Sequence, residues 1–228
     1  MWLSTSRPTF PEQISVRDFE LGETDDSHAA GCWQMSLGYV KVRSRVVGFK
    51  TMERDEVIAV HQLDLPPIEL DTRGLWMSPL RPLHTLLSPG RDLLGSLHAA
   101  EHALIHAMPL LAMCDRGDAG GISTLTGPGN SEPLMLLHDA YEGGAGTVDE
   151  SFHSFRVLAG LTLEMIESCD CGSAGCHRCC YSRLCGSDNE TMDRLGAIHL
   201  LKSLLENPPD GSIDHRLEGP PGGPTERG

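Results

Sequence analysis

The stretch Ser168–Gly186, SCDCGSAGCHRCCYSRLCG, decides how the C-terminal half of this 228-residue chain is held together. It contains six of the eight cysteines of the chain: Cys169, Cys171, Cys176, Cys179, Cys180 and Cys185. Zinc favours four ligands in a tetrahedron, commonly thiolates from Cys-x2–4-Cys knuckles. Cys176 and Cys179 have that spacing, and a tighter Cys-x-Cys pair lies just upstream. The stretch therefore predicts a small metal-binding loop.

Five cysteines are candidate ligands for four places on the ion: Cys169, Cys171, Cys176, Cys179 and Cys185. Cys180 is the expected spare thiol, and the spacing leaves open which four of the five bind. A site with four nearby thiolates is closed, so one structural zinc ion is expected rather than a catalytic one. An iron–sulfur cluster, a disulfide framework and unligated thiols remain as alternatives.

Composition places the chain among globular proteins of a reducing compartment. Hydrophobic residues make up 39% of it, and the first ten residues lack the apolar segment of a signal peptide. We therefore expect a cytoplasmic protein with no membrane partner, in which clustered cysteines indicate metal binding more often than disulfides. The net charge of −14 argues against a protein that coats nucleic acid through bulk positive charge.

Periodicity outside the loop predicts mainly helices. Helical spacing of apolar residues extends over residues 92–113, 147–168 and 189–205, so the cysteine loop would connect the last two helices. Residues 37–51 alternate as a strand, and residues 63–76, with two prolines, predict an extended connector ending in a short strand. The fold class expected is α+β, a mostly helical domain with a small antiparallel sheet near residues 37–51.

The chain divides into three parts on the same grounds. Residues 1–31 show no sustained period and predict an irregular or junction segment. Residues 32–206 form the predicted domain, and residues 207–228, rich in proline and glycine, predict a disordered tail.

Cations on one face of the predicted strand are candidate contacts for a phosphate backbone. Lys41, Arg43 and Arg45 share one parity, and the cysteine loop adds Arg178 and Arg183. A solvated strand face explains the first three equally well. Such contacts would give salt-dependent affinity without sequence preference.

The helix over residues 92–113 carries a second metal-like motif. His98, Glu101 and His102 match His-x-x-Glu-His, an inverted zinc-protease signature in which both histidines share one helix face. Histidines packed in a core or interface are the plainer interpretation, because Leu97, Leu104 and similar neighbours require burial. The alternative function is a zinc-dependent hydrolase that uses residues 98–102.

The order of several segments resembles the zinc-binding C-terminal domain of DEAD/DEAH-box helicases of the mitomycin repair factor A type. The matching segments are GYVKV at 38–42, LDLPPIELDTRGLW at 63–76, LHAAEHALIHAMPLLAMCDRGDAGG at 97–121, HDAYEGGAG at 138–146 and CDCGSAGCHRC at 169–179. The resemblance extends from about Leu37 to Leu205. The family motif reads approximately C-x-C, C-P-x-C and S-P-K-C-G, so it departs here at His177, Arg183 and Leu184, and none of these changes removes a thiolate.

The resemblance implies a non-catalytic zinc-binding domain of a superfamily 2 DNA repair helicase, which would brace the motor or guide DNA. It also implies a helicase motor domain or chain as partner, with only weak DNA binding by the domain alone. The chain has no phosphate-binding loop and no convincing D-E-x-H box, so it is not expected to be an enzyme by itself. A truncated or split helicase, a separate subunit and a functionless fragment remain open.

Overall fold

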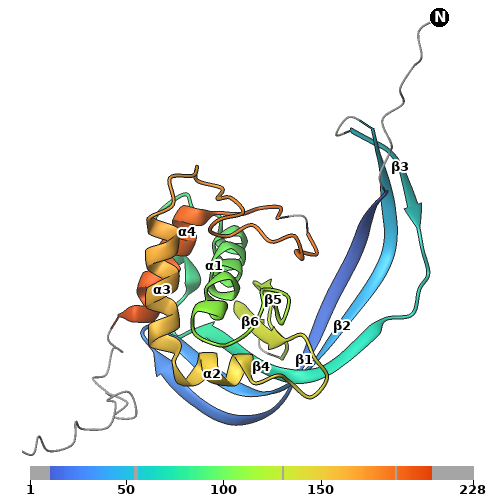
Figure 1. Cartoon of the computed structure of the whole chain (residues 1–228). Helices are drawn as coiled ribbons and strands as arrows, with labels where there is room; N and C mark the ends of the chain where they lie inside the picture. The colour runs from blue at the N-terminus through green and yellow to red at the C-terminus, as the bar shows by residue number, and fades with distance from the viewer. Residues whose placement is uncertain (1–10, 54–55, 130, 188, 207–228) are drawn as a thin grey trace, which may run out of the picture.

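The computed structural model describes residues 11–53, 56–129, 131–187 and 189–206. Within them, a six-stranded antiparallel sheet carries the helices on one face (Figure 1). The strands are β1 (Pro11–Ala30), β2 (Trp33–Glu53), β3 (Glu56–Gln62), β4 (Ile68–Pro79), β5 (Ala119–Thr124) and β6 (Leu134–Asp139). The sheet order is β1-β2-β4-β6-β5, and β3 pairs with the far end of β2 beyond β4.

Four α-helices form the second layer. They are α1 (Leu93–Ala107), α2 (Thr147–His153), α3 (Phe155–Glu167) and α4 (Arg194–Leu205), with short 3-10 turns at Leu83–Thr85 and Met108–Leu110. Helix α1 lies against β5 and β6, and both α3 and α4 pack on α1. None of the helices in the described ranges is long and apolar enough to cross a membrane.

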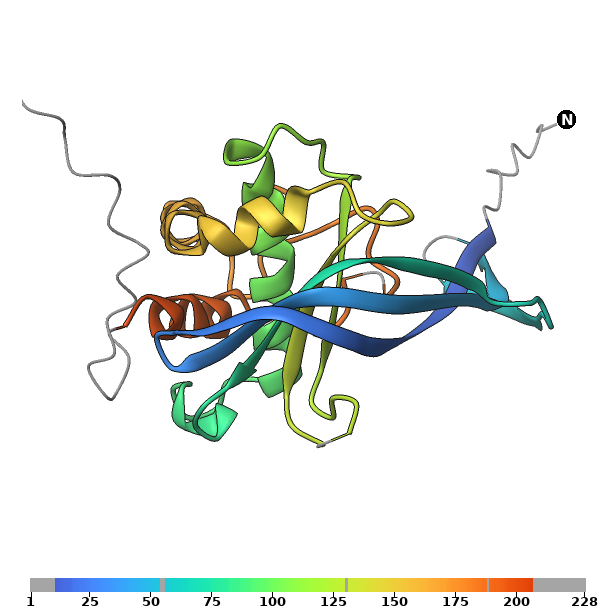
Figure 2. The same ribbon diagram turned by 90° about the horizontal axis from the view of Figure 1, so that it is seen from below.

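The outer parts of β1 and β2, together with β3, form an arm, which we define as residues 11–21, 40–53 and 56–62. Figures 1 and 2 show this arm extending past the helical layer. In the body of the molecule, Met35, Leu75, Met77 and Leu137 face the helices and share one core with them. The alternate residues of the same strands, such as Val40 and Trp76, form a smaller apolar cluster on the opposite face.

The expectation of a mostly helical domain with a small sheet is wrong. Of the residues that the structure describes, 28% are helical and 37% lie in strands, and the sheet has six strands. Two stretches account for the largest part of the difference, and β3 and β5 were not expected as strands either. Residues 11–30, expected to be irregular, form β1, and residues 68–79, expected to be mainly a connector, form β4.

The two stretches form strands for different physical reasons. Strand β1 is rich in acids and has no strict alternation, so its stability comes from pairing with β2 along nearly its whole length rather than from its own pattern. Pro66 and Pro67 do not disrupt β4, because they precede its first residue. They therefore occupy no position where the ladder requires a backbone N–H donor. The predicted tail, residues 207–228, lies outside the described residues, and the division into three parts stays a prediction.

The predicted helix over residues 147–168 is interrupted at Ser154, which separates α2 from α3. Gly146 is the N-cap of α2 and has no side chain that could cap the first turn. Instead, the buried Asp139 carboxylate accepts hydrogen bonds from the backbone N–H groups of Ala145, Gly146 and Val148 at 2.6–3.1 Å. The end of β6 therefore holds the start of α2.

Gly95 sets the close approach between α1 and the segment that leads into α4. A Cβ at this position would lie 2.0 Å from the backbone oxygen of Thr191. The Gly95 carbonyl also accepts a hydrogen bond of 3.0 Å from the backbone N–H of Asp193. By contrast, a Cβ at Gly160 in α3 would meet no atom within 4 Å.

We therefore expect alanine to have opposite effects at these two glycines. Gly95→Ala should lower the free energy of unfolding by about 3 kcal/mol, since a backbone atom cannot move aside. Gly160→Ala should raise it by about 0.5–1 kcal/mol through helix propensity and the unfolded chain. Urea unfolding of the zinc-loaded protein measures both. Equal stability of Gly95→Ala and wild type would contradict the close approach.

Candidate metal centre

The cysteine loop is held between α3 and α4 by Arg194, the first residue of α4. Its buried guanidinium donates hydrogen bonds to the carbonyl of Ile166 at 2.9 and 3.1 Å and to that of Cys169 at 2.6 Å. Its backbone N–H donates to the Ser173 carbonyl at 2.8 Å. One side chain thus satisfies carbonyls at the end of α3 and at the start of the loop.

Four sulfurs of this loop converge on one point. The Sγ atoms of Cys169, Cys171, Cys176 and Cys179 all lie within 4.8 Å of one another. The Cys169–Cys176 pair is separated by 3.6 Å, Cys171–Cys179 by 3.5 Å and Cys176–Cys179 by 4.0 Å. A tetrahedron with zinc–sulfur bonds of about 2.3 Å has sulfur–sulfur edges of about 3.8 Å. The four thiols therefore have the spacing that one zinc ion requires.

The surroundings of the four thiols shift their pKa values in different directions. Burial, with hydrogen bonds from neighbouring thiols, raises the pKa of Cys171, and burial also raises the pKa of Cys179. The backbone N–H of Arg178, 3.4 Å from the Cys176 sulfur, lowers the pKa of that thiol. Because thiolates are the zinc-binding form, a dication would drive the ionisation that burial opposes. The donor set thus fits zinc.

Cys180 and Cys185 lie outside this group of four. Cys180 is fully buried, and its Sγ is 3.5 Å from that of Cys179, but it is not among the four mutually close sulfurs. Cys185 lies instead against the histidines of α1, where its Sγ is 3.3 Å from Nε2 of His98. The five candidate ligands of the sequence are therefore divided between two places.

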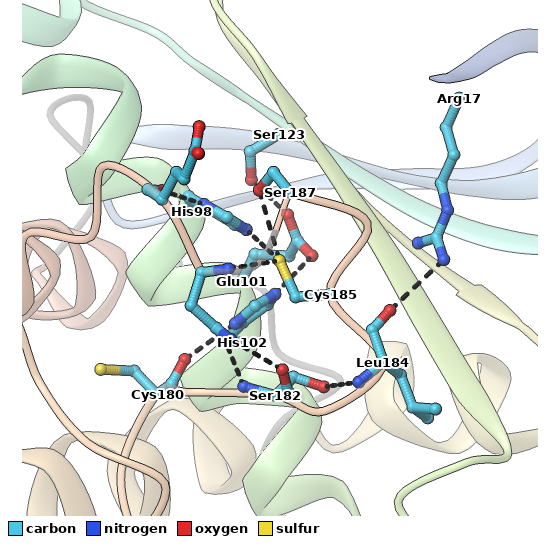
Figure 3. A network of polar contacts seen from close by, with 12 residues as sticks. Arg17, His98, Glu101, His102, Ser123, Cys180, Ser182, Leu184, Cys185 and Ser187 are labelled. Atoms are coloured by element: carbon cyan, nitrogen blue, oxygen red, sulfur yellow. Dashed lines mark hydrogen bonds and ion pairs between the residues drawn. The ribbon is translucent and has the colours of Figure 1, made fainter. Parts of the chain in front are cut away.

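The His-x-x-Glu-His motif forms the second place (Figure 3). His98, His102 and Cys185 each offer one ligand atom, and these three atoms lie within 4.8 Å of one another. His102 is buried and His98 partly exposed. Sequence reasoning noted the shared helix face but missed Cys185. The sequence did carry a signal for it: Cys185, followed by Gly186, is a further cysteine beyond the four thiols that one zinc ion needs.

Glu101 is buried beside these histidines, with 3% of its surface exposed. Its carboxylate accepts a hydrogen bond from the Ser123 hydroxyl and lies 3.9 Å from Nε2 of His102. Burial raises the pKa of Glu101, and the histidines oppose that shift. The backbone of β5 comes so close here that a Cβ at Gly121 would lie 2.4 Å from a carboxylate oxygen of Glu101.

These side chains line a cavity of about 410 Å³ between α1, β5 and residues 182–187 and 190–191. Arg17, Arg116, Ser123 and Ser187 are also in its wall. The N-terminal strand therefore contributes to the cavity, since Arg17 of β1 donates to the Leu184 carbonyl at 3.3 Å. The motif is partly buried, as the core interpretation expected, and it also faces an open space.

Two of the five candidate phosphate contacts are engaged by acids. Lys41 lies 2.9 Å from Asp71, and Arg43 lies 2.9 Å from Glu69 and 2.7 Å from Glu20. These acids come from β1 and β4, the two strands that the sequence did not predict in full. Hydrogen bonds from Arg43 and the charge of Lys41 lower the pKa of Glu69. This face of the arm is a mixed-charge surface rather than a basic one.

The other three candidate contacts are exposed. Arg45 lies on the arm, and Arg178 and Arg183 lie on the cysteine loop. Within the described ranges, no salt bridge within 4.0 Å involves any of the three. The structure therefore does not gather the five predicted cations into one patch.

Comparison with known protein families gives a match over residues 100–180, described as the MrfA Zn-binding domain. The match begins in α1 and ends after the second cysteine pair. It includes Glu101, His102 and all four clustered cysteines. The prediction of a zinc-binding domain with one four-cysteine cluster is confirmed.

Three relatives match parts of the chain. ATP-dependent helicase hrq1 of Schizosaccharomyces pombe is 29% identical over 196 residues, which are 77% of this chain and 18% of the helicase. An uncharacterized protein of Methanocaldococcus jannaschii is 32% identical over 112 residues, 48% of this chain and 99% of that protein. The uncharacterized ATP-dependent helicase YprA of Bacillus subtilis is 26% identical and matches 73% of this chain, but only 22% of the helicase.

Solved structures of DUF1998 helicase MrfA have the same fold over this region. A DNA-bound structure aligns with a TM-score of 0.63 and 23% identity, covering 86% of this chain and 26% of the helicase. A structure with DNA and AMPPNP aligns with a TM-score of 0.53 and 21% identity, covering 85% of this chain and 22% of the helicase. The chain thus spans about a quarter or less of the helicases that it matches.

Proposed function

The chain belongs to the MrfA Zn-binding domain family, and from this we propose that it acts as a zinc-braced module of a DNA helicase. The observation that carries the proposal is the four-thiol cluster inside the matched region. The shared fold with DNA-bound helicase structures supports it. The module itself performs no ATP chemistry.

Its motor would be supplied by another part of the same protein or by a partner chain. The two relatives named as helicases are several times longer than their matching segments, which are 18% and 22% of their lengths. In both, the remainder has room for motor lobes. The zinc loop would then stiffen α3 and α4, so that the module presents a fixed surface to the motor.

The arm offers an apolar surface for such a partner. Val57, Ile58 and Val60 of β3 are 50–59% exposed. Exposed apolar residues gathered on one projecting strand pair are typical of interaction surfaces. We assign this end of the arm to the motor and the cysteine loop to the DNA side.

Contact with DNA would be weak and unspecific. Arg178 and Arg183 are exposed on the cysteine loop, whereas Lys41 and Arg43 are neutralised by acids on neighbouring strands. With a net charge of −14, the chain gains little long-range attraction to phosphates. A few arginines held in place by the zinc loop would guide a strand that the motor already holds.

We expect the variant Arg178→Ala/Arg183→Ala to lose salt-dependent affinity for single-stranded DNA. The slope of log K against log salt should fall by about 0.7 for each lost phosphate contact, about 1.4 in total, and equally for different sequences. Lys41→Ala is the matched control and should change the slope little. Fluorescence anisotropy with labelled oligonucleotides over a salt series gives both values.

An unchanged slope in the double arginine variant, or a larger loss in Lys41→Ala, would contradict this assignment. Zinc removal by a chelator should abolish the same affinity, because the loop would lose its shape. Hydrolysis at His98, Glu101 and His102 stands as the second candidate function, favoured by the cavity and by Cys185. It requires a metal ion at these side chains, so metal content comes before any assay of activity.

A further inference from the structure

We propose that His98, His102 and Cys185 form a second metal site, which binds a zinc-class dication and leaves one coordination position open to the cavity. The three ligand atoms come from α1 and from the return of the cysteine loop, 87 residues apart in the sequence. This site does not depend on the helicase role of the module.

The distances fit a tetrahedral ion. With zinc–nitrogen bonds of about 2.0 Å and zinc–sulfur bonds of about 2.3 Å, a nitrogen and a sulfur on one ion lie about 3.5 Å apart. Nε2 of His98 lies 3.3 Å from Sγ of Cys185, and all three ligand atoms are within 4.8 Å of one another. Figure 3 shows both rings directed at the same sulfur.

The surroundings orient each ligand. Nδ1 of His102 is 2.8 Å from the Cys180 carbonyl, and Nδ1 of His98 is 3.3 Å from the Glu190 carbonyl. A carbonyl can only accept, so each Nδ1 carries a proton, and in the neutral ring each Nε2 then keeps a free lone pair. The backbone N–H of Asn189 donates to the Cys185 sulfur at 3.3 Å. This arrangement is typical of histidines and thiolates that bind a metal.

Charge balance also favours a dication. Glu101 is buried with only Ser123 and the weakly paired His102 as described partners. An ionised Glu101 and the Cys185 thiolate that a bound metal requires would place two negative charges here, and burial penalises them without a cation. One dication would neutralise both.

The fourth position faces the cavity. Three protein ligands with an exchangeable fourth place are typical of catalytic rather than structural zinc. Arg17, Arg116, Ser123 and Ser187 line the same space, so a water molecule or an anionic oxygen ligand such as a phosphate fits there. Glu101 lies beside this position and would receive a hydrogen bond from a bound water.

The test is zinc per chain, measured by elemental analysis after zinc loading and desalting against a weak chelator. We expect about two zinc ions in wild type and about one in Cys185→Ala and in His98→Ala/His102→Ala. Cys180→Ala is the matched control, because Cys180 is a buried thiol that belongs to neither group of ligands, so this variant should retain about two ions. Far-UV circular dichroism checks that each variant keeps its helices.

One zinc in wild type, or two in folded Cys185→Ala, would overturn the proposal. If the histidine variants do not fold, zinc-edge X-ray absorption on wild type decides instead. Two sites predict five sulfurs and two imidazoles shared between the ions, whereas a spectrum explained by sulfur alone would refute the second site.

Discussion

Replacing Cys179 by serine is expected to remove zinc from the four-cysteine cluster and to unfold the cysteine loop together with α4. The Cys179 sulfur lies within 4.0 Å of the sulfurs of Cys171 and Cys176, so its loss leaves the cluster with three of its four thiols. A serine hydroxyl remains protonated and is a poor zinc ligand. Metal content and helicity should therefore fall together.

The size of this effect follows from the free energy of metal binding. Structural zinc contributes roughly 10–16 kcal/mol of apparent binding free energy in small sites at neutral pH. The total stability of a domain is only about 5–15 kcal/mol. Loss of the ion is therefore enough to leave the C-terminal half unfolded at room temperature. Elemental analysis and far-UV circular dichroism on the same sample measure both losses.

Cys114→Ser is the matched control for this prediction. Cys114 is a partly buried free thiol that belongs to neither cysteine group, so its serine variant should retain metal and helicity. A Cys179→Ser protein with full zinc and native helicity would show that the cluster does not hold α3 and α4 together.

Arg194→Met is expected to lower the free energy of unfolding by about 4 kcal/mol. The Arg194 guanidinium is buried and donates hydrogen bonds to the carbonyls of Ile166 and Cys169. Methionine has a similar length but no donor, so these carbonyls would lose a charged partner without gaining water. Chemical unfolding in excess zinc measures the change.

Arg91→Met is the control at the same end of α4. Arg91 contacts Asp193 at 3.1 Å, but its side chain is 29% exposed, so the loss should be below about 1 kcal/mol. The account predicts a clear difference between the two variants, and equal losses would mean that Arg194 does not clamp the cysteine loop.

Local patterns in the sequence were sufficient where the chain determines its own structure. The strand expected at residues 37–51 lies within β2, and the helix expected from residue 92 is α1. The two cysteine pairs at Cys169–Cys171 and Cys176–Cys179 are close in sequence, and the structure brings their sulfurs together. Knuckle spacing carries this information without any tertiary contact.

Non-local pairing explains the rest. Strand β1 could not be predicted from its own residues, because its acids pair with cations of β2. Glu20, for example, lies opposite Lys41 in the register and contacts Arg43. The same pairing removes Lys41 and Arg43 from the expected phosphate contacts. Cys185 was grouped with the other thiols by proximity in sequence, whereas its contact with His98 spans 87 residues.

The measurement that tests the central claim most directly is zinc-edge X-ray absorption on the Cys185→Ala variant. This variant removes the second site and leaves Cys169, Cys171, Cys176 and Cys179 intact. The account predicts a single zinc whose first shell contains four sulfurs at about 2.3 Å. A shell with nitrogen or oxygen in place of any sulfur, or a folded protein without zinc, would contradict it.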